Sequence, residues 1–289
     1  FGPYFTPAHH TPWGEAVNYD HDGSQQVRAF VIDSALRWMR DFHIDALRLD
    51  AIHEIKDDAA AAATPQRHVL AELSDAVAAL SIELGRPLSL VAEADLNDVG
   101  VITPTSEEPP AKVPSLGMTA QWADDVHHAL HVRLTGEDQG YYGDFAEVGA
   151  WAKAYGRAFL HNGTWSTFRE RNWGAPVPED TDPRRFVVFG SDHDQVGNRA
   201  VGDRPSAILD DAALAATAAL VLLSPYTPML FMGEEWGTRT PFQFFTDHEE
   251  DDLARSVSEG RVREFAGFGW DADEIPDPQD TATVETSRL

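Results

Sequence analysis

Three apolar runs along the chain each end abruptly in a carboxylate, and they are the clearest pattern in the sequence. They span residues 46–50, 88–93 and 186–194, and they close with Asp50, Glu93 and the pair His193-Asp194. An apolar run bounded by turn residues is typical of a buried parallel strand. In a sheet or barrel of such strands, the acids at the carboxyl ends converge on one face. We therefore expect these carboxylates to lie at a common edge.

Other elements follow from helical periodicity, capping residues and breakers. Residues 1–23, rich in Pro, Gly and aromatic residues, are expected to form a structured loop, and residues 162–184 a long functional loop. Ser24 is the expected N-cap of the first helix. The pattern predicts helices over residues 24–42, 59–84, 125–134, 144–160, 205–223 and 248–265. It predicts two further strands over residues 118–122 and 228–232.

Strands that alternate with helices imply right-handed βαβ units and a parallel sheet. Five strands are expected, and the class is α/β: a (β/α)8 TIM-type barrel of which only the later strands, about strands 4 to 8, are present. Residues 1–270 are expected to form the catalytic barrel, and residues 271–289 a polar tail or the start of a truncated C-terminal region. The first residue is Phe1 rather than Met, so we expect a piece of a longer protein.

Composition narrows the function classes. The chain has 289 residues with 43% hydrophobic and 24% charged content, which is ordinary for a globular enzyme. Its formal net charge of −26 argues against nucleic acid as a partner, and a neutral substrate fits it better. No apolar run approaches the length of a membrane helix, so no membrane partner is expected and a cytoplasmic location is the default. Cysteine is absent, which excludes disulfides and thiolate metal sites.

No metal and no cofactor are expected. No set of His and carboxylate residues has convincing metal-ligand spacing, and the Gly residues match no phosphate-binding loop. The remaining histidines are predicted to be ordinary loop or surface residues, for example His9, His10, His43 and His161.

The carboxylates at the strand ends suit glycoside hydrolysis, which uses one carboxyl group as acid and a second as nucleophile or base. Asp50 and Glu93 follow successive strands, and Arg48 lies on the same side of its strand as Asp50. A guanidinium there keeps Asp50 ionised, whereas the apolar run before Glu93 is expected to raise the pKa of that carboxyl. Asp194, beside His193, supplies a third acid. Three alternatives stay open: a structural ion pair for Arg48 and Asp50, a cap for Glu93, and a simple turn for His193-Asp194.

Residues 45–53, 91–98 and 192–199 resemble three of the four signature regions of the α-amylase superfamily of glycoside hydrolases. The resemblance implies that Asp50 is the nucleophile, Glu93 the general acid/base and Asp194 the transition-state stabiliser. It implies a set of residues that contact the sugars: Arg48, His53, Asp125, His127, His128, His193, Gln195, Asn198 and Trp236. The first signature region has no counterpart here, and the front of the barrel is therefore expected to lie outside this sequence.

Two groups in that set have equally simple structural interpretations. Asp125, His127 and His128 suit a helix N-cap and first turn, with the His pair facing solvent. Trp236 is either a stacking platform for a sugar or a residue that packs its loop.

Finer features narrow the resemblance to one branch of the superfamily. Residues 2–14, 121–130 and 231–248 are similar to the branch that releases trehalose from the end of maltooligosyl trehalose, with water as acceptor. The resemblance therefore implies a retaining enzyme, with Asp50 and Glu93 carboxyl groups ~5–5.5 Å apart. The alternatives are a glucan branching enzyme, another hydrolase of α-1,4-glucans, and a non-catalytic glucan-binding fragment. In each case a missing barrel segment or a partner is expected to complete the fold.

Overall fold

The computed structural model describes residues 2–58, 67–110, 112–266 and 271–289. The chain divides into two compact units. The first comprises residues 1–126, 147–187 and 225–227, and the second comprises residues 127–146, 188–224 and 228–289. Part of the predicted helix over residues 59–84 lies outside the described residues.

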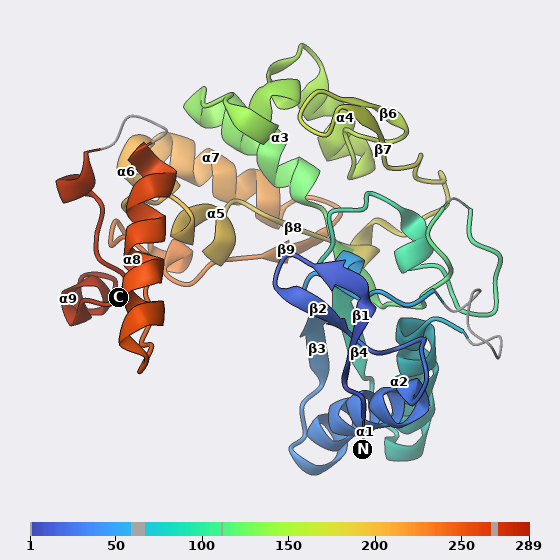
Figure 1. Cartoon of the computed structure of the whole chain (residues 1–289). Coiled ribbons are helices and arrows are strands. Elements are labelled where there is room, and N and C mark those ends of the chain that lie inside the picture. The colour runs from blue at the N-terminus through green and yellow to red at the C-terminus, as the bar shows by residue number, and fades with distance from the viewer. Residues whose placement is uncertain (1, 59–66, 111, 267–270) are drawn as a thin grey trace. The chain divides into compact units, whose positions relative to one another are not determined.

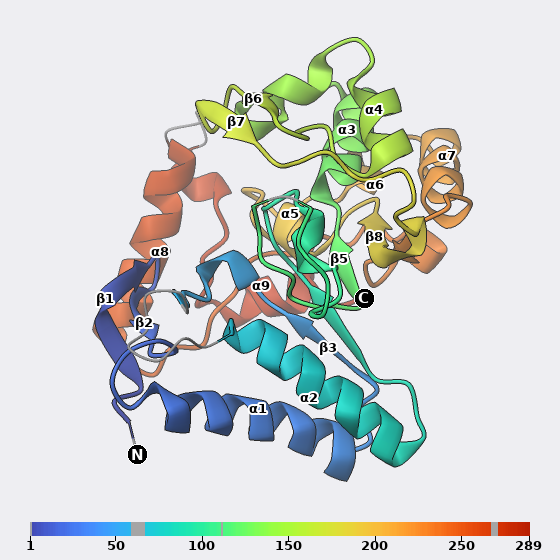
Figure 2. The same ribbon diagram turned by 90° about the vertical axis from the view of Figure 1, so that its right-hand side faces the viewer.

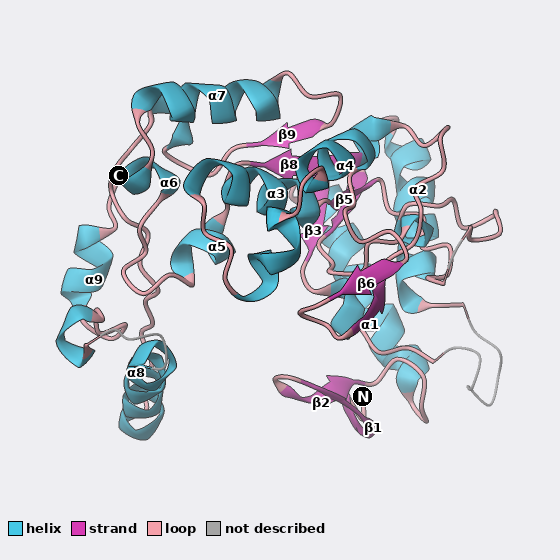
Figure 3. Cartoon of the chain, turned by 90° about the horizontal axis from the view of Figure 1, so that it is seen from above, coloured by secondary structure: helices cyan, strands magenta, loops and turns pink. Residues whose placement is uncertain are grey.

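A parallel sheet of five strands is the main element (Figure 1), as the alternating pattern predicts. Its order is β3-β4-β5-β8-β9, and Figure 3 shows β9 lying beside β8. The strands are β3 (Ala46–Leu49), β4 (Ser89–Ala92), β5 (Ala120–Trp122), β8 (Phe186–Phe189) and β9 (Thr227–Met229). The boundary between the two units falls within β8 and within β9.

The register of β3 against β4 determines where the candidate acids lie. Ala46 pairs with Ser89, and Leu49 pairs with Ala92 at the other end of the ladder. Asp50 and Glu93 are therefore the first residues beyond two strands that end side by side.

Helices occupy most of the predicted helical segments. They are α1 (Ser24–Asp41), α2 (Val69–Leu84), α3 (Asp124–Thr135), α4 (Ala150–Arg157), α5 (His193–Gly197), α6 (Pro205–Ile208), α7 (Asp211–Leu222), α8 (Asp251–Ala266) and α9 (Thr281–Thr286). Short 3-10 helices lie at Ile52–Glu54, Val99–Val101, Gly140–Ala146, Pro183–Arg185, Glu234–Trp236 and Ala272–Glu274. Figure 2 shows α1 and α2 side by side in the first unit. Among the described residues, no helix combines the length and apolar character that crossing a membrane requires.

Several local predictions are wrong. The N-terminal loop contains a hairpin of β1 (Phe5–Thr11) and β2 (Gly14–Val17), and the long loop contains a hairpin of β6 (Thr164–Ser166) and β7 (Arg171–Trp173). Gly23, with a positive φ of 81°, precedes α1 where Ser24 was expected to be the N-cap.

The Ala-rich segment over residues 205–223 forms two helices instead of one. Leu209 is extended and ends α6, and the Asp210 carboxylate accepts a hydrogen bond from the Ala213 N–H and begins α7. A single acidic residue at a cap position is a weak signal inside a run of alanines, so the pattern hid this break.

The strand formed by the third apolar run, β8, ends at Phe189, four residues before His193. Phe186–Phe189 is fully buried, and the chain then turns, because the Asp192 carboxylate accepts hydrogen bonds from the N–H groups of Asp194 and Gln195. His193 and Asp194 therefore lie in the first turn of α5, and the prediction that they end a strand is wrong.

Residues 271–289 are part of the second unit and pack against its other segments. Ile275 packs with Ala200 and Phe265, with Val201 and Val262 at the margin of the same cluster. The Ser287 hydroxyl accepts a hydrogen bond from the Gln243 N–H at 3.0 Å. The domain boundary at residue 270 stays a prediction.

Candidate active site

Asp50 and Glu93 share one cation, Arg48. The Arg48 Nη1 lies 2.7 Å from Asp50 Oδ1, and its Nη2 lies 3.6 Å from Glu93 Oε2. The guanidinium also stacks over the ring of Trp122 on β5, 4.4 Å from the ring centroid. Three neighbouring strands thus supply one cluster, and the first two predicted catalytic residues lie together at the end of the sheet.

Glu93 is the more enclosed of the two acids. Its side chain is 16% exposed, whereas that of Asp50 is 71% exposed. The Ala51 N–H donates a 2.6 Å hydrogen bond to Glu93 Oε2, and the Ile52 N–H donates one to the Glu93 carbonyl oxygen at 3.1 Å. Glu93 is thereby fixed against the turn that follows Asp50.

The backbone at Ala51 is strained. Its φ of 42° is in the left-handed region, which costs a residue with a Cβ about 1–2 kcal/mol. The Ala51 N–H, held in this conformation, donates the hydrogen bond to the Glu93 carboxylate. Strain of this kind is common where the backbone serves a functional site.

The Glu93 carboxylate has polar partners beyond the apolar run that precedes it. The apolar side chains of Leu90 and Ala92 are buried in the core, as alternate positions of β4 require. The Glu93 carboxylate lies beyond the strand end and faces an N–H group and a guanidinium. The 5–5.5 Å separation of the two carboxyl groups stays a prediction.

His53 lies just beyond this turn, on the 3-10 helix Ile52–Glu54. Its Nε2 is 3.9 Å from Glu54 Oε1, and its side chain is 31% exposed. The Lys56 ammonium donates to the His53 carbonyl oxygen at 3.0 Å. Its role toward a sugar stays a prediction.

Asp125 is buried, with 2% exposure. Its Oδ2 accepts three hydrogen bonds, from Asn97 Nδ2 at 2.9 Å, from the Leu160 N–H at 2.7 Å and from the His161 N–H at 3.0 Å. Burial raises the pKa of Asp125 to about 6, although the two backbone donors oppose the shift. The carboxylate is committed to groups of the chain itself, which favours a structural role over a sugar contact.

His127 is also buried, so the alternative that the His pair faces solvent is wrong for this residue. Its Nδ1 lies 2.8 Å from the Gly190 carbonyl oxygen and its Nε2 lies 3.3 Å from the Tyr142 hydroxyl. Burial lowers the pKa of His127 to about 3, so the ring is neutral at ordinary pH. His128 is half-buried, with its ring centroid 5.0 Å from that of Phe145.

The segment of α5 carries His193, Asp194, Gln195 and Asn198. His193 and Asp194 are 45% and 57% exposed, and His193 Nε2 lies 3.4 Å from Asp194 Oδ2. Gln195 is half-buried, while Asn198 is exposed and its N–H donates to the Asp194 carbonyl oxygen at 3.0 Å. The predicted third acid therefore lies in an open position within the second unit.

The sequence did not predict a charged network that Glu137, His131, Arg199 and Asp203 form. Glu137 accepts two hydrogen bonds from Arg199, at 2.8 and 3.0 Å, and its Oε2 lies 2.7 Å from His131 Nε2. Arg199 also pairs with Asp203 at 2.8 Å. The Arg199 hydrogen bonds lower the pKa of Glu137 to about 2, although burial opposes the shift. The network anchors Arg199, two residues beyond the end of α5. Glu137 and Arg199 are 62 positions apart, so no local pattern could have revealed their pairing.

Trp236, on the 3-10 helix Glu234–Trp236, is 65% exposed. Its neighbour Glu234 accepts hydrogen bonds from the Ser191 hydroxyl at 2.6 Å and from the Phe231 N–H at 2.9 Å. Burial raises the pKa of Glu234. Glu234 also lines a cavity of about 340 Å³ beside α7. Stacking of a sugar on Trp236 stays a prediction.

Comparison with known proteins confirms the resemblance. The chain is 52% identical over 289 residues to a malto-oligosyltrehalose trehalohydrolase of Arthrobacter ramosus, of which it covers 48%. It is 50% identical over 290 residues to that of Mycobacterium tuberculosis, covering 48%, and 40% identical over 288 residues to that of Saccharolobus solfataricus, covering 47%. No family model matches the chain.

A solved structure supports the fold. The chain is similar, with a TM-score of 0.82 and 38% identity, to a Salmonella typhimurium protein described provisionally as an α-amylase. The match covers 98% of this chain and 46% of that one.

The parallel sheet, with two acids at adjacent strand ends, is that of an α/β fold of the α-amylase type, present as part of a barrel. Within this class, the chain is similar over its whole length to the malto-oligosyltrehalose trehalohydrolases. It spans about half the length of the curated relatives that it matches.

Proposed function

We propose that the chain carries the catalytic acids of a retaining glycoside hydrolase, which cleaves the α-1,4 bond next to the trehalose end of maltooligosyl trehalose. The observation that carries the proposal is the Arg48 bridge between Asp50 and Glu93, in a chain whose whole length matches trehalohydrolases. The proposal includes a role in trehalose biosynthesis and a cytoplasmic location.

In this mechanism Asp50 attacks the anomeric carbon while Glu93 protonates the departing oxygen. The bond to the trehalose unit breaks, and the glucan becomes covalently attached to Asp50. Glu93 then removes a proton from water, which attacks the anomeric carbon and restores the Asp50 carboxylate. The exposure of Asp50 suits a nucleophile that a sugar must reach, and the Arg48 guanidinium, 2.7 Å away, orients its carboxylate.

The other roles come from the resemblance. Asp194 stabilises positive charge in the transition state, and Arg48, His53, His193, Gln195, Asn198 and Trp236 contact the sugars. Asp125, His127 and His128 support this machinery from within the fold, since Asp125 and His127 are buried against other parts of the chain.

Activity is proposed to need the sequence that completes the barrel. Large apolar side chains on α1 and at its C-cap are open to solvent in this chain: Phe30 is 63% exposed, Trp38 50% and the C-cap Phe42 53%. A face of this kind is costly to leave in water, which supports a requirement for a covering segment.

The test is incubation with maltooligosyl trehalose, of the chain alone and of the chain joined to the remaining half of a trehalohydrolase relative. We expect free trehalose and a glucan of retained configuration. Asp50→Asn should abolish release, and the far-UV circular dichroism spectrum should be unchanged. The exposed Asp33→Asn is the matched control and should release trehalose at the normal rate. Turnover that survives in Asp50→Asn would exclude Asp50 as nucleophile.

A glucan branching enzyme is the second candidate, favoured by a local match. Over 43 residues, 15% of the chain, it is 49% identical to a 1,4-alpha-glucan branching enzyme of Leifsonia xyli. New branch points in amylose without trehalose release would establish that activity, and shortened unbranched glucans would indicate another α-glucan hydrolase. Glucan binding by the joined protein without any product would identify a non-catalytic module.

A further inference from the structure

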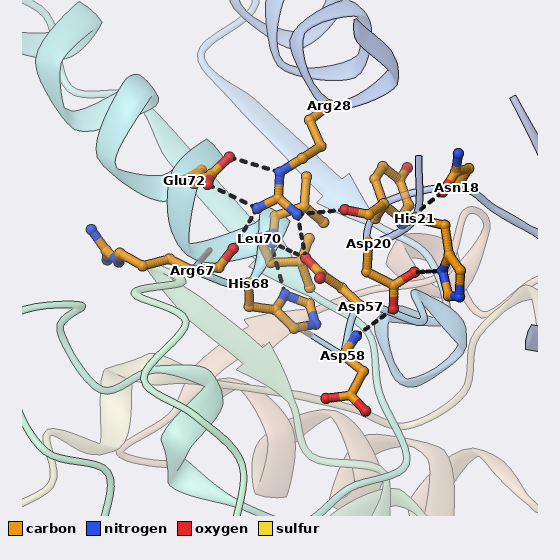
Figure 4. Close-up of polar contacts among 12 residues, drawn as sticks. Asn18, Asp20, His21, Arg28, Asp57, Asp58, Arg67, His68, Leu70 and Glu72 are labelled. Atoms are coloured by element: carbon orange, nitrogen blue, oxygen red, sulfur yellow. Dashed lines mark hydrogen bonds and ion pairs between the residues drawn. The ribbon is translucent and has the colours of Figure 1, made fainter. Parts of the chain in front are cut away.

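Two histidines and one aspartate meet beside the N-terminal hairpin. His9 lies on β1, and Asp20 and His21 lie in the turn between β2 and α1. The Asp20 carboxylate contacts both rings, with His9 Nε2 2.7 Å from Oδ2 and His21 Nδ1 2.5 Å from Oδ1. Figure 4 shows the Asp20–His21 contact and the surrounding polar groups. One donor atom from each of the three residues lies within 4.8 Å of the others.

Asp20 is held firmly in this position. Its side chain is only 2% exposed, and its Oδ2 also accepts a 2.7 Å hydrogen bond from the Asp58 N–H. The bond from the Asp58 N–H thus fixes the carboxylate beside the two imidazole rings.

The His21 turn is fixed as well. Asn18 Oδ1 accepts a hydrogen bond from the His21 N–H at 3.0 Å, and Asn18 Nδ2 donates to the Asp22 carbonyl oxygen at 3.0 Å. His21 is 48% exposed and His9 26% exposed. The cluster is thus preorganised by the fold and reachable from solvent on the His21 side.

A nearby cation has its own partners. Arg28, in the same view, pairs with Asp57 at 2.7 Å and Glu72 at 2.9 Å (Figure 4). Among the described residues, the His9 and His21 imidazoles are the side chains that form ion pairs with the Asp20 carboxylate, and Arg28 pairs with other acids.

We propose that His9, Asp20 and His21 bind one divalent transition-metal ion of the zinc class. Two imidazoles and one carboxylate are a donor set that suits Zn²⁺, Co²⁺ and Ni²⁺ better than Mg²⁺ or Ca²⁺, which prefer oxygen ligands. Zinc–ligand bonds of about 2.0–2.1 Å place tetrahedral ligand atoms about 3.3 Å apart. The His9–Asp20 contact of 2.7 Å and the His21–Asp20 contact of 2.5 Å therefore need to widen by about 0.6 and 0.8 Å.

The bound ion fastens the hairpin to the body of the first unit. His9 belongs to β1, Asp20 and His21 precede α1, and the Asp58 N–H connects Asp20 to the segment beyond the Ile52–Glu54 helix. The ion is placed here as a structural ligand, and the proposal is independent of the proposed hydrolysis.

The experiment titrates the metal-stripped chain with Co²⁺ and Zn²⁺, followed by the visible absorption of Co²⁺ and by calorimetry. We expect one ion per chain, and an absorption spectrum typical of imidazole and carboxylate ligands. His9→Gln and His21→Gln should each weaken binding at least 10-fold. His10→Gln is the matched control on the same strand, because the His10 side chain is exposed and its Nδ1 lies 3.2 Å from the His9 carbonyl oxygen.

A second group, Asp192, His193 and Asp194, also has donor atoms within 4.8 Å of one another, so His193→Gln is included. Binding that is unaffected in His193→Gln and lost in both His9→Gln and His21→Gln supports the proposal. Absence of binding, or equal weakening in His10→Gln, overturns it. If one variant fails to fold, as circular dichroism reports, the other still decides the question.

Discussion

Asp125→Asn is the substitution whose effect the structure specifies most fully. Asparagine keeps an oxygen that can accept the hydrogen bonds from Asn97 and from the N–H groups of Leu160 and His161. It removes the charge that burial disfavours. The perturbation therefore isolates the cost of ionising one enclosed carboxyl group.

The sign and size of the change in the free energy of unfolding with pH follow from the raised pKa of Asp125. The pKa of Asp125 rises from 3.8 in the unfolded chain to about 6 in the folded one. The folded state therefore holds its proton longer, and this contribution to stability is complete below pH 4 and falls as the pH rises through 6. A shift of about two units corresponds to roughly 3 kcal/mol over the full range, of which about 1.4 kcal/mol falls between pH 5 and 7.5.

The assay is urea unfolding of the wild-type chain and of Asp125→Asn at pH 5, 6, 7 and 7.5. Other titrating groups cancel in the difference between the two proteins, so we expect the variant to gain about 1.4 kcal/mol relative to the wild type across this range. Asp33→Asn, the same change at an exposed position, should show no such trend. A difference between Asp125→Asn and wild type that stays constant with pH would refute the reasoning.

Two further predictions concern the frame around the site. Gly174→Ala should lower the free energy of unfolding by about 3 kcal/mol or more, since the new Cβ would lie 2.0 Å from a carbonyl oxygen; Gly136→Ala, with a similar φ and open space, should cost only about 1–2 kcal/mol. Thermal and urea unfolding measure both, and equal costs would contradict the steric argument. Glu137→Gln should lose about 1–2 kcal/mol at pH 7 by weakening the bonds to Arg199, and the wild-type advantage should disappear as the pH falls from about 4.5 towards 2. The control is Glu179→Gln, which removes the exposed ion pair of Glu179 with Arg157 and should alter the free energy of unfolding by less than about 0.5 kcal/mol. An equal loss in Glu179→Gln and Glu137→Gln would show that the Glu137 network stabilises the fold no more than an exposed ion pair does.

The sequence by itself determined the parallel sheet and the location of the first two acids. Apolar runs and the alternation of helices and strands are local signals, and each was sufficient to place a strand. Arg48 precedes Asp50 by two positions, so strand geometry alone predicted that they share a side, and the 2.7 Å contact agrees.

Local patterns failed where a side chain is satisfied by a remote part of the chain. The polar surroundings of Glu93 come from Ala51, 42 positions earlier, and the enclosure of Asp125 comes from Leu160 and His161, 35 and 36 positions later. His9 was expected to be an ordinary loop or surface residue, yet it lies on β1 with its Nε2 2.7 Å from the buried Asp20 carboxylate. Hydrophobic periodicity specifies which face of an element is buried. The partner that an individual polar group meets depends on how distant segments pack, and only the tertiary structure decides that.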